Sequence, residues 1–183
     1  MLRAINGYLV ATLLTFQSPT PQVPLDVQLP AFLKALSFDR HLTVSDGPLT
    51  IGVVFDPADE RSLSVKDRLL EIHKELTRLR VKGQRVELVP IPYDSDSALA
   101  AAGVKVLLVA PVPASSLERL VRLSATSDFL TLATDVADVG RGLTMGMEME
   151  GGRPRFVVNL GASVEAGASF ESSFLTLCRI VEK

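Results

Sequence analysis

The pair Gly151-Gly152 constrains the fold of this chain more than any other feature of its sequence. Two consecutive glycines supply the positive backbone φ angles of a two-residue β-hairpin turn, so we expect a strand on each side. Counting outward from the turn sets acid against base on one face of the hairpin and apolar against apolar on the other. The predicted pairs are Glu150–Arg153, Glu148–Arg155, Met147–Phe156 and Met145–Val158. Such cross-strand pairs stabilise a sheet, so the sequence predicts the register together with the turn.

Apolar runs and helical periodicities alternate upstream of the hairpin. Strands are expected at 49–55, 86–91, 104–110 and 129–134, and the continuous apolar runs at 49–55 and 104–110 suit strands covered on both faces. Helices are expected at 30–40, with Pro30 in the first turn, and at 62–80, 95–102 and 169–181. A further helix is expected to begin at the capping box Ser115-x-x-Glu118. Pro90 places the second strand at an edge of the sheet or near its own end. Residues 135–141 read as a loop or a short helical turn.

This alternation predicts an α/β layered sandwich with a mainly parallel central sheet of about six strands and helices on both faces. The C-terminal β-hairpin must add an antiparallel edge, because a two-residue turn cannot join parallel strands. The length of 183 residues fits one such domain, which we assign to residues 26–183.

The N-terminus is typical of an export signal. Arg3 precedes a short apolar run at 8–16, and a polar, proline-rich stretch follows it. The run is shorter than the roughly 20 residues that cross a bilayer. We therefore interpret residues 1–25 as a signal peptide and a proline-rich linker, and expect a periplasmic protein. The alternative is an N-terminal helix or strand of a cytosolic domain.

Composition and motifs favour a protein without catalytic groups. The net charge of −2 with 5% aromatic residues disfavours nucleic-acid binding. The single cysteine, Cys178, excludes an intramolecular disulfide and is expected to be a buried packing thiol. His41 and His73 lack ligand spacing and are expected on the surface, while Ser163 and Ser169 read as helix caps. We therefore expect no catalytic set, no metal and no cofactor.

One placement argument remains. In open α/β sheets, ligands bind outside the carboxyl ends of the parallel strands. Here that rim would carry Asp56, Tyr93, Pro111, Thr134 and Asp135. We regard Asp56, Tyr93, Thr134 and Asp135 as a candidate ligand or partner rim, with a plain solvent-facing edge as the alternative.

The C-terminal third carries a combination of short motifs: Gly140-Arg141-Gly142, Gly151-Gly152, Arg155-Phe156, Asn159-Leu160, Ala166-Gly167, Ser172-Ser173 and the segment 175–181. In this combination it resembles the YfiR family. A looser match comprises 29–34, Phe38-Asp39-Arg40 and the 49–55 strand, so that the resemblance covers residues 26–181. The paired cysteines of some members are missing here, so redox control of folding is not carried over.

The resemblance implies an exported regulatory protein without enzymatic activity, which acts by protein–protein contact. Its partner would be a membrane-anchored signalling protein such as a diguanylate cyclase, which it restrains to alter cyclic-di-GMP levels; a homo-oligomer is a further expectation. The alternative is an extracytoplasmic small-ligand binding or sensor domain that uses the strand-end rim. A hydrolase is disfavoured, because the motifs that would supply its nucleophile and base are missing.

Overall fold

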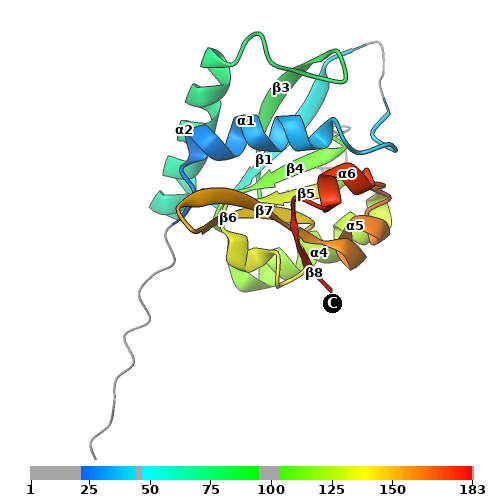
Figure 1. Ribbon diagram of the computed structural model, residues 1–183. Coiled ribbons are helices and arrows are strands. Elements are labelled where there is room, and N and C mark those ends of the chain that lie inside the picture. The colour runs from blue at the N-terminus through cyan, green and yellow to red at the C-terminus, as the bar shows by residue number, and fades with distance from the viewer. Residues whose placement is uncertain (1–21, 44–46, 95–103, 183) are drawn as a thin grey trace, which may run out of the picture.

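A computed structural model describes residues 22–43, 47–94 and 104–182 (Figure 1). The predicted signal peptide up to residue 21 and the predicted helix 95–102 lie outside these residues. The strands are β1 (Leu49–Phe55), β2 (Arg80–Val81), β3 (Gln84–Pro92), β4 (Val106–Val109), β5 (Leu130–Ala133), β6 (Met145–Glu150), β7 (Arg153–Asn159) and β8 (Arg179–Val181). The helices are α1 (Leu25–Leu36), α2 (Glu60–Glu75), α4 (Ala114–Ser127), the 3₁₀ turn η1 (Val136–Asp138), α5 (Leu160–Glu165) and α6 (Ser172–Leu175).

The strands form one mostly parallel sheet in the order β2-β3-β1-β4-β5-β6-β7-β8. Within the described residues, the β2–β3 and β6–β7 pairs are antiparallel and the other neighbouring strands of the sheet are parallel. The predicted α/β sandwich with a mainly parallel sheet is therefore confirmed. The eight strands exceed the six expected because two short strands, β2 and β8, add one partner at each end of the sheet.

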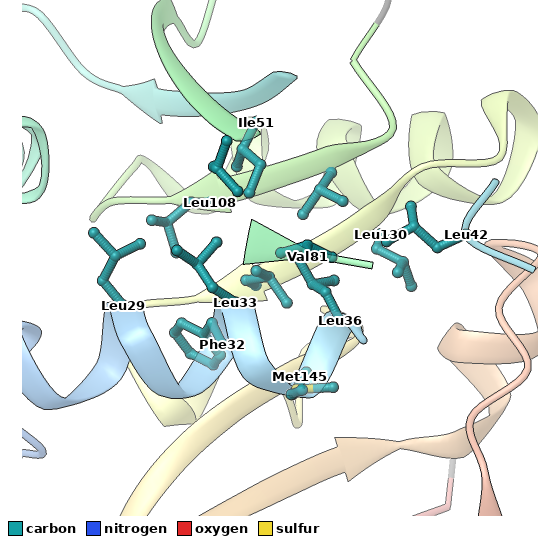
Figure 2. Close-up of a cluster of buried hydrophobic side chains, with 14 of the residues drawn as sticks. Leu29, Phe32, Leu33, Leu36, Leu42, Ile51, Val81, Leu108, Leu130 and Met145 are labelled. Atoms are coloured by element: carbon teal, nitrogen blue, oxygen red, sulfur yellow. The ribbon is translucent and has the colours of Figure 1, made fainter. Parts of the chain in front are cut away.

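Helices cover both faces of the sheet, and alternate strand residues point to each of them. One core joins α1 and α2 to the sheet, and Figure 2 shows Leu29, Phe32, Leu33 and Leu36 of α1 turned toward the strands. The other core packs Leu117 and Leu120 of α4 against residues such as Leu107 and Val109 of β4. Both faces of β4 are buried, as its unbroken apolar sequence predicts.

The Gly-Gly hairpin has the predicted turn and register. Gly151 and Gly152 have φ angles of 56° and 77°. All four predicted pairs are Cα partners in the β6–β7 ladder. The ion pairs, however, do not follow the directly opposite positions. Arg155 pairs diagonally with Glu150, and Glu148 pairs with Arg179 of β8.

The predicted helix at 169–181 is wrong. Only Ser172–Leu175 is helical, and Arg179–Val181 form β8, parallel to β7. The apolar stripe fails at Leu177, whose side chain is 70% exposed. The β-branched Ile180 and Val181 favour a strand, and by pairing they satisfy backbone groups on the outer side of β7.

Three predicted helix starts are also wrong. α1 begins at Leu25 after Pro24, so Pro30 lies inside the helix, and the added first turn packs Leu25 against the core and buries Gln28. α4 begins at Ala114 after Pro113, whose carbonyl accepts the first helical bonds, and no side chain caps it. The cap of α5 is Asn159, whose Oδ1 accepts from the amide of Ala162.

The two serines interpreted as caps have other roles. The Ser163 hydroxyl lies inside α5 and donates to the Asn159 carbonyl at 2.7 Å. The Ser169 amide donates to Oδ1 of Asp39 at 2.8 Å, and the residue before α6 is Glu171. Asn159 could be expected to cap because it leaves a strand and starts a turn, a position where its side chain bonds nearby amides.

Candidate functional site

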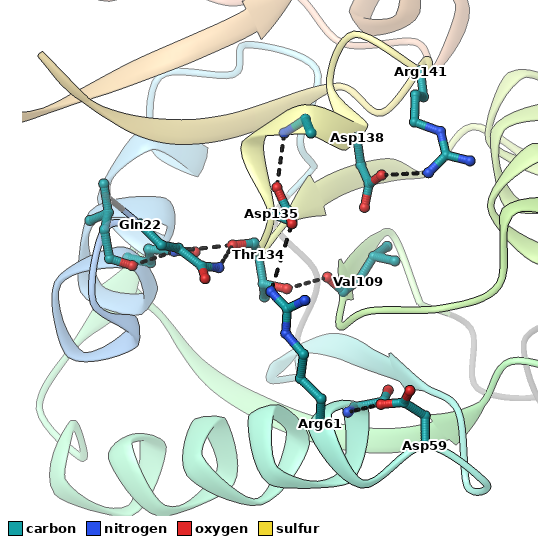
Figure 3. Close-up of polar contacts among 12 residues, drawn as sticks. Gln22, Asp59, Arg61, Val109, Thr134, Asp135, Asp138 and Arg141 are labelled. Carbon is teal, nitrogen blue, oxygen red and sulfur yellow. Dashed lines mark hydrogen bonds and ion pairs between the residues drawn. The ribbon is translucent and has the colours of Figure 1, made fainter. Parts of the chain in front are cut away.

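The structure brings the predicted rim residues to the carboxyl ends of β1, β3 and β5. Figure 3 shows Thr134 at its centre. The Thr134 hydroxyl donates to the Val109 carbonyl at 2.8 Å, which ties the end of β5 to the end of β4. The Thr134 carbonyl accepts from the side-chain amides of Gln22 at 2.7 Å and Gln28 at 3.2 Å. Thr134 is therefore fully bonded within the protein.

Gln22 and Gln28 lie over the end of β5 and were not found by sequence reasoning. Gln28 is 1% exposed, and its amide also donates to the Val23 carbonyl at 2.7 Å. Its Oε1 is buried without a hydrogen-bond partner among the described residues. The segment before α1 thus covers the middle of the rim. Gln28 lies upstream of the predicted helix at 30–40, so no sequence signal pointed to this contact.

Asp56 serves the turn between β1 and α2. Its Oδ1 accepts from the Ala58 amide at 2.8 Å, and its own amide donates to the Ser62 hydroxyl at 2.8 Å. Asp59 then caps α2 by accepting from the Ser62 amide at 2.7 Å. Asp56 is only 7% exposed. Both aspartates are thus engaged in starting the helix.

Charged side chains continue the rim beyond Thr134. The Asp135 carboxylate accepts from the Ala137 amide at 3.1 Å and lies 3.8 Å from the guanidinium of Arg61. Asp138 pairs with Arg141 at 3.1 Å. Burial, followed by repulsion from Asp135, raises the pKa of Asp138 above its ordinary value. Arg61 was not predicted, because only the fold brings the first turn of α2 to the end of β5.

Tyr93 and Pro111 lie at the ends of the neighbouring strands. The Tyr93 amide donates to the Phe55 carbonyl at 2.9 Å, and the Tyr93 carbonyl accepts from the Arg119 guanidinium. Pro111 is half-buried directly after β4. The structure therefore gathers all the predicted rim residues at one end of the sheet, where most of their polar groups bond to the protein itself.

A pocket of about 280 Å³ lies at the opposite, amino end of the parallel strands. Lys105 precedes β4 and Leu130 begins β5, and both line it. His41, which is exposed, places its Nδ1 2.9 Å from the Gly167 carbonyl, so that nitrogen donates. The contact joins the segment after α1 to the loop before α6. Sequence reasoning had assigned His41 only to the surface and did not locate this pocket.

The second histidine is half-buried rather than simply solvated. His73 Nε2 lies 2.9 Å from the Val86 carbonyl, which can only accept, so Nε2 carries the proton. Cys178 is buried, as expected, but it lies between α6 and β8 rather than inside a helix. Burial raises the pKa of its thiol to about 11. In the part of the chain that the structure describes, no three metal-ligating side chains cluster.

The fold defines an α/β domain whose strand ends form a polar rim. One similar solved structure is the ABC domain in complex with L-Trp from Streptococcus pneumonia, with a TM-score of 0.59 and 15% identity over 86% of this chain and 62% of that one. A second is a conserved domain protein from Vibrio cholerae, with a TM-score of 0.61 and 14% identity over 87% of this chain and 60% of that one. A third is the ligand-free, open structure of CD0873, a substrate binding protein with adhesive properties from Clostridium difficile, with a TM-score of 0.54 and 17% identity over 73% of this chain and 54% of that one. This chain thus spans 54–62% of those chains. At these identities the similarity concerns the fold alone.

The family is shown by a sequence model. The model of the YfiR/HmsC-like family matches residues 57–179, more than half of the chain, and the chain belongs to that family. It is a family of periplasmic regulatory proteins that is not known as enzymatic, and its members act with a membrane signalling partner. No curated protein matches the chain. Among the described residues, no helix is long and apolar enough to cross a membrane.

Proposed function

We propose that this protein is an exported regulator that binds a membrane-bound diguanylate cyclase and restrains its activity. The observation that carries the proposal is the match of residues 57–179 to the YfiR/HmsC-like family. The rim chemistry agrees with a non-enzymatic role, because its carboxylates cap turns and pair with arginines. A general base would instead need a free group within reach of a substrate proton.

We infer that the contact surface is the carboxyl-terminal edge, which consists of β8 and Leu177. β8 is the outermost strand at its end of the sheet, so one side of its backbone has no neighbouring strand among the described residues. Leu177 is 70% exposed and Ile180 is 37% exposed. An open sheet edge with large exposed apolar side chains is a surface that partner proteins use.

A Leu177→Asp substitution tests this surface in cells that produce the full-length protein and a membrane-bound diguanylate cyclase from the same genome. Wild type is expected to lower cyclic-di-GMP and to be captured with the cyclase from solubilised membranes, whereas L177D does neither. The matched control is Val89→Asp, which adds the same charge at an exposed residue near the opposite end of the sheet. Unchanged cyclic-di-GMP together with no captured membrane partner for wild type would refute the proposal.

The second candidate function is a small-ligand sensor domain. The observation in its favour is the fold shared with a domain in complex with L-Trp and with a substrate binding protein. Its ligand site would be the rim of Asp56, Tyr93, Thr134 and Asp135. A thermal-shift screen of metabolites tests it, because a ligand that binds only the folded state raises the melting temperature. Asp135→Asn should abolish such a shift if the ligand lies on the rim.

A further inference from the structure

A groove of about 390 Å³ lies at the other end of the sheet from β8, between the end of α2 and the β2–β3 hairpin. Its lining combines cationic side chains with an apolar base, and Glu87 is the one carboxylate among the lining residues. Lys74, Arg80 and Arg85 supply the positive charge, and Leu76 and Leu79 form the apolar base. A chain of net charge −2 thus concentrates positive charge in one hollow.

Two arginines of this groove face each other. Arg80 of β2 and Arg85 of β3 are direct Cα partners across the antiparallel hairpin that Lys82 and Gly83 close with φ angles of 49° and 84°. Directly opposite residues in such a pair place their side chains on the same face, and like charges there repel. Repulsion of this kind is relieved by an anion bound between the two guanidinium groups.

Among the described residues, no carboxylate forms an ion pair with the cations of the groove. Within the described chain, neither Lys74, Arg80 nor Arg85 forms an ion pair. By contrast, Arg61, Arg68, Arg141, Arg155 and Arg179 all pair with a carboxylate. The Arg80 guanidinium is held in place by one nitrogen, which donates to the Thr77 carbonyl at 2.7 Å and to the Leu79 carbonyl at 3.0 Å.

The strand edge beside the groove is closed to an added peptide strand. Beyond Arg85, β1 is the one strand of the described residues that pairs with β3, and the other side of β3 has no neighbouring strand among them. The Val86 carbonyl on this side already accepts from His73. In a strand, every second residue directs its backbone polar groups to the same side, so Pro90 and Pro92 face the same side as Val86. Neither proline has an N–H that could donate to an added strand. A compact anion therefore suits the groove better than an extended acidic peptide.

We propose that this groove binds a phosphate group, held between Arg80 and Arg85 with Lys74 nearby. Arginine pairs bind phosphate through charge-assisted hydrogen bonds, and a fork of donors fits its oxygens. The apolar base formed by Leu76 and Leu79 admits an organic phosphate. The phosphate comes from a soluble phosphate ester or from a lipid headgroup, and the two sources are separated by the test.

The test compares two double variants of the full-length protein that lose the same charge. Arg80→Gln with Arg85→Gln removes the paired arginines of the groove. Arg122→Gln with Arg153→Gln removes two exposed arginines elsewhere and serves as the control. Binding of inorganic phosphate and glycerol 3-phosphate is measured by calorimetry at constant ionic strength. Binding to phosphatidylglycerol vesicles is measured by co-sedimentation, with phosphatidylcholine vesicles for comparison.

Wild type and the control variant are expected to bind at least one of these probes, and R80Q/R85Q should bind it about tenfold more weakly or not at all. Saturation by glycerol 3-phosphate assigns a soluble ester, whereas binding only to phosphatidylglycerol vesicles assigns a lipid headgroup. Binding to neither source, or equal weakening in the control, overturns the proposal. The single variant Arg85→Gln gives a second readout that does not require R80Q/R85Q to fold. At low salt it should melt at a higher temperature than wild type. Added phosphate should raise the melting temperature of wild type but not that of R85Q. A lower melting temperature with the phosphate response retained would contradict the site.

Discussion

Glu148 and Arg179 form a two-pronged ion pair that reaches across a whole strand. Arg179 Nε donates to Glu148 Oε1 at 2.6 Å, and Arg179 Nη2 donates to Glu148 Oε2 at 2.9 Å. Glu148 is on β6 and Arg179 is on β8, with β7 between them in the sheet. The hydrogen bond to Glu148 raises the pKa of the Arg179 guanidinium above its already high ordinary value. The pair therefore fastens the last strand to the hairpin.

Arg179→Ala should destabilise the protein by about 1 kcal/mol, at the upper end for a surface pair, because Glu148 is largely covered and the contact is bidentate. Urea unfolding measures the loss, and a double-mutant cycle with Glu148→Gln isolates the coupling. Arg153→Ala is the matched control, since Arg153 is exposed and forms no ion pair with a described residue. Equal losses for the two alanine variants would show that the pair contributes nothing specific.

Cys178 should be inert in the folded protein. Its thiol has a pKa raised to about 11 by burial, so little thiolate exists at neutral pH and a thiol reagent reacts only after unfolding. The unfolded thiol, with its pKa near 9.0, ionises first, so folded-state stability falls as the pH rises from about 9 to 11. Cys178→Ser should flatten this alkaline loss in pH-dependent urea melts. Rapid labelling of the native protein at pH 7 would contradict the burial of this thiol.

Asp138→Asn should stabilise the protein at neutral pH. The raised pKa of Asp138 means that the folded state binds its proton more tightly than the unfolded state, so the ionised carboxylate opposes folding above that pKa. As the pH falls through the folded pKa, the carboxylate is protonated and the advantage of the variant disappears. Melting temperatures from pH 3 to 8 measure the difference. A variant that is less stable at pH 7 would show that the pair with Arg141 outweighs burial.

Gly146→Ala should cost about 1–3 kcal/mol through overpacking. A Cβ at this position of β6 would lie 2.7 Å from Val139 Cγ2 and 3.3 Å from the Val136 Cα, and the backbone of η1 cannot easily retreat. Gly140→Ala is the control, because its nearest atom, the Ala137 carbonyl oxygen, would be 3.5 Å away. Chemical unfolding compares the two. A loss no greater than that of G140A would mean that η1 shifts freely.

The hairpin and the buried strands could be predicted because their signals are local. Gly151-Gly152 favours a two-residue turn with positive φ angles, and alternation then fixes which residues face each other. Unbroken apolar runs such as Val106–Val109 identify strands with helices on both sides. Pro90 also indicated the edge, because its backbone nitrogen faces the side of β3 that has no neighbouring strand among the described residues.

The remaining features depend on long-range contacts. Arg179 pairs with Glu148 only because β8 folds back beside β7, and helical spacing around Phe170 and Phe174 had suggested a continuous helix. The β2–β3 hairpin gives little local signal, because its turn at Lys82-Gly83 directly follows a strong helical pattern. At the rim, a general rule for α/β sheets located Thr134, whereas the contact with Gln22 spans more than a hundred residues.

The most direct test of the regulatory role is the cyclic-di-GMP level in cells that carry a membrane-bound diguanylate cyclase from the same genome. Wild type and V89D should lower this level at equal protein abundance, whereas L177D should leave it at the value of cells that lack the protein. Equal lowering by L177D would contradict the carboxyl-terminal edge as the contact surface. No lowering by wild type, with no cyclase captured alongside it, would contradict the regulatory role itself.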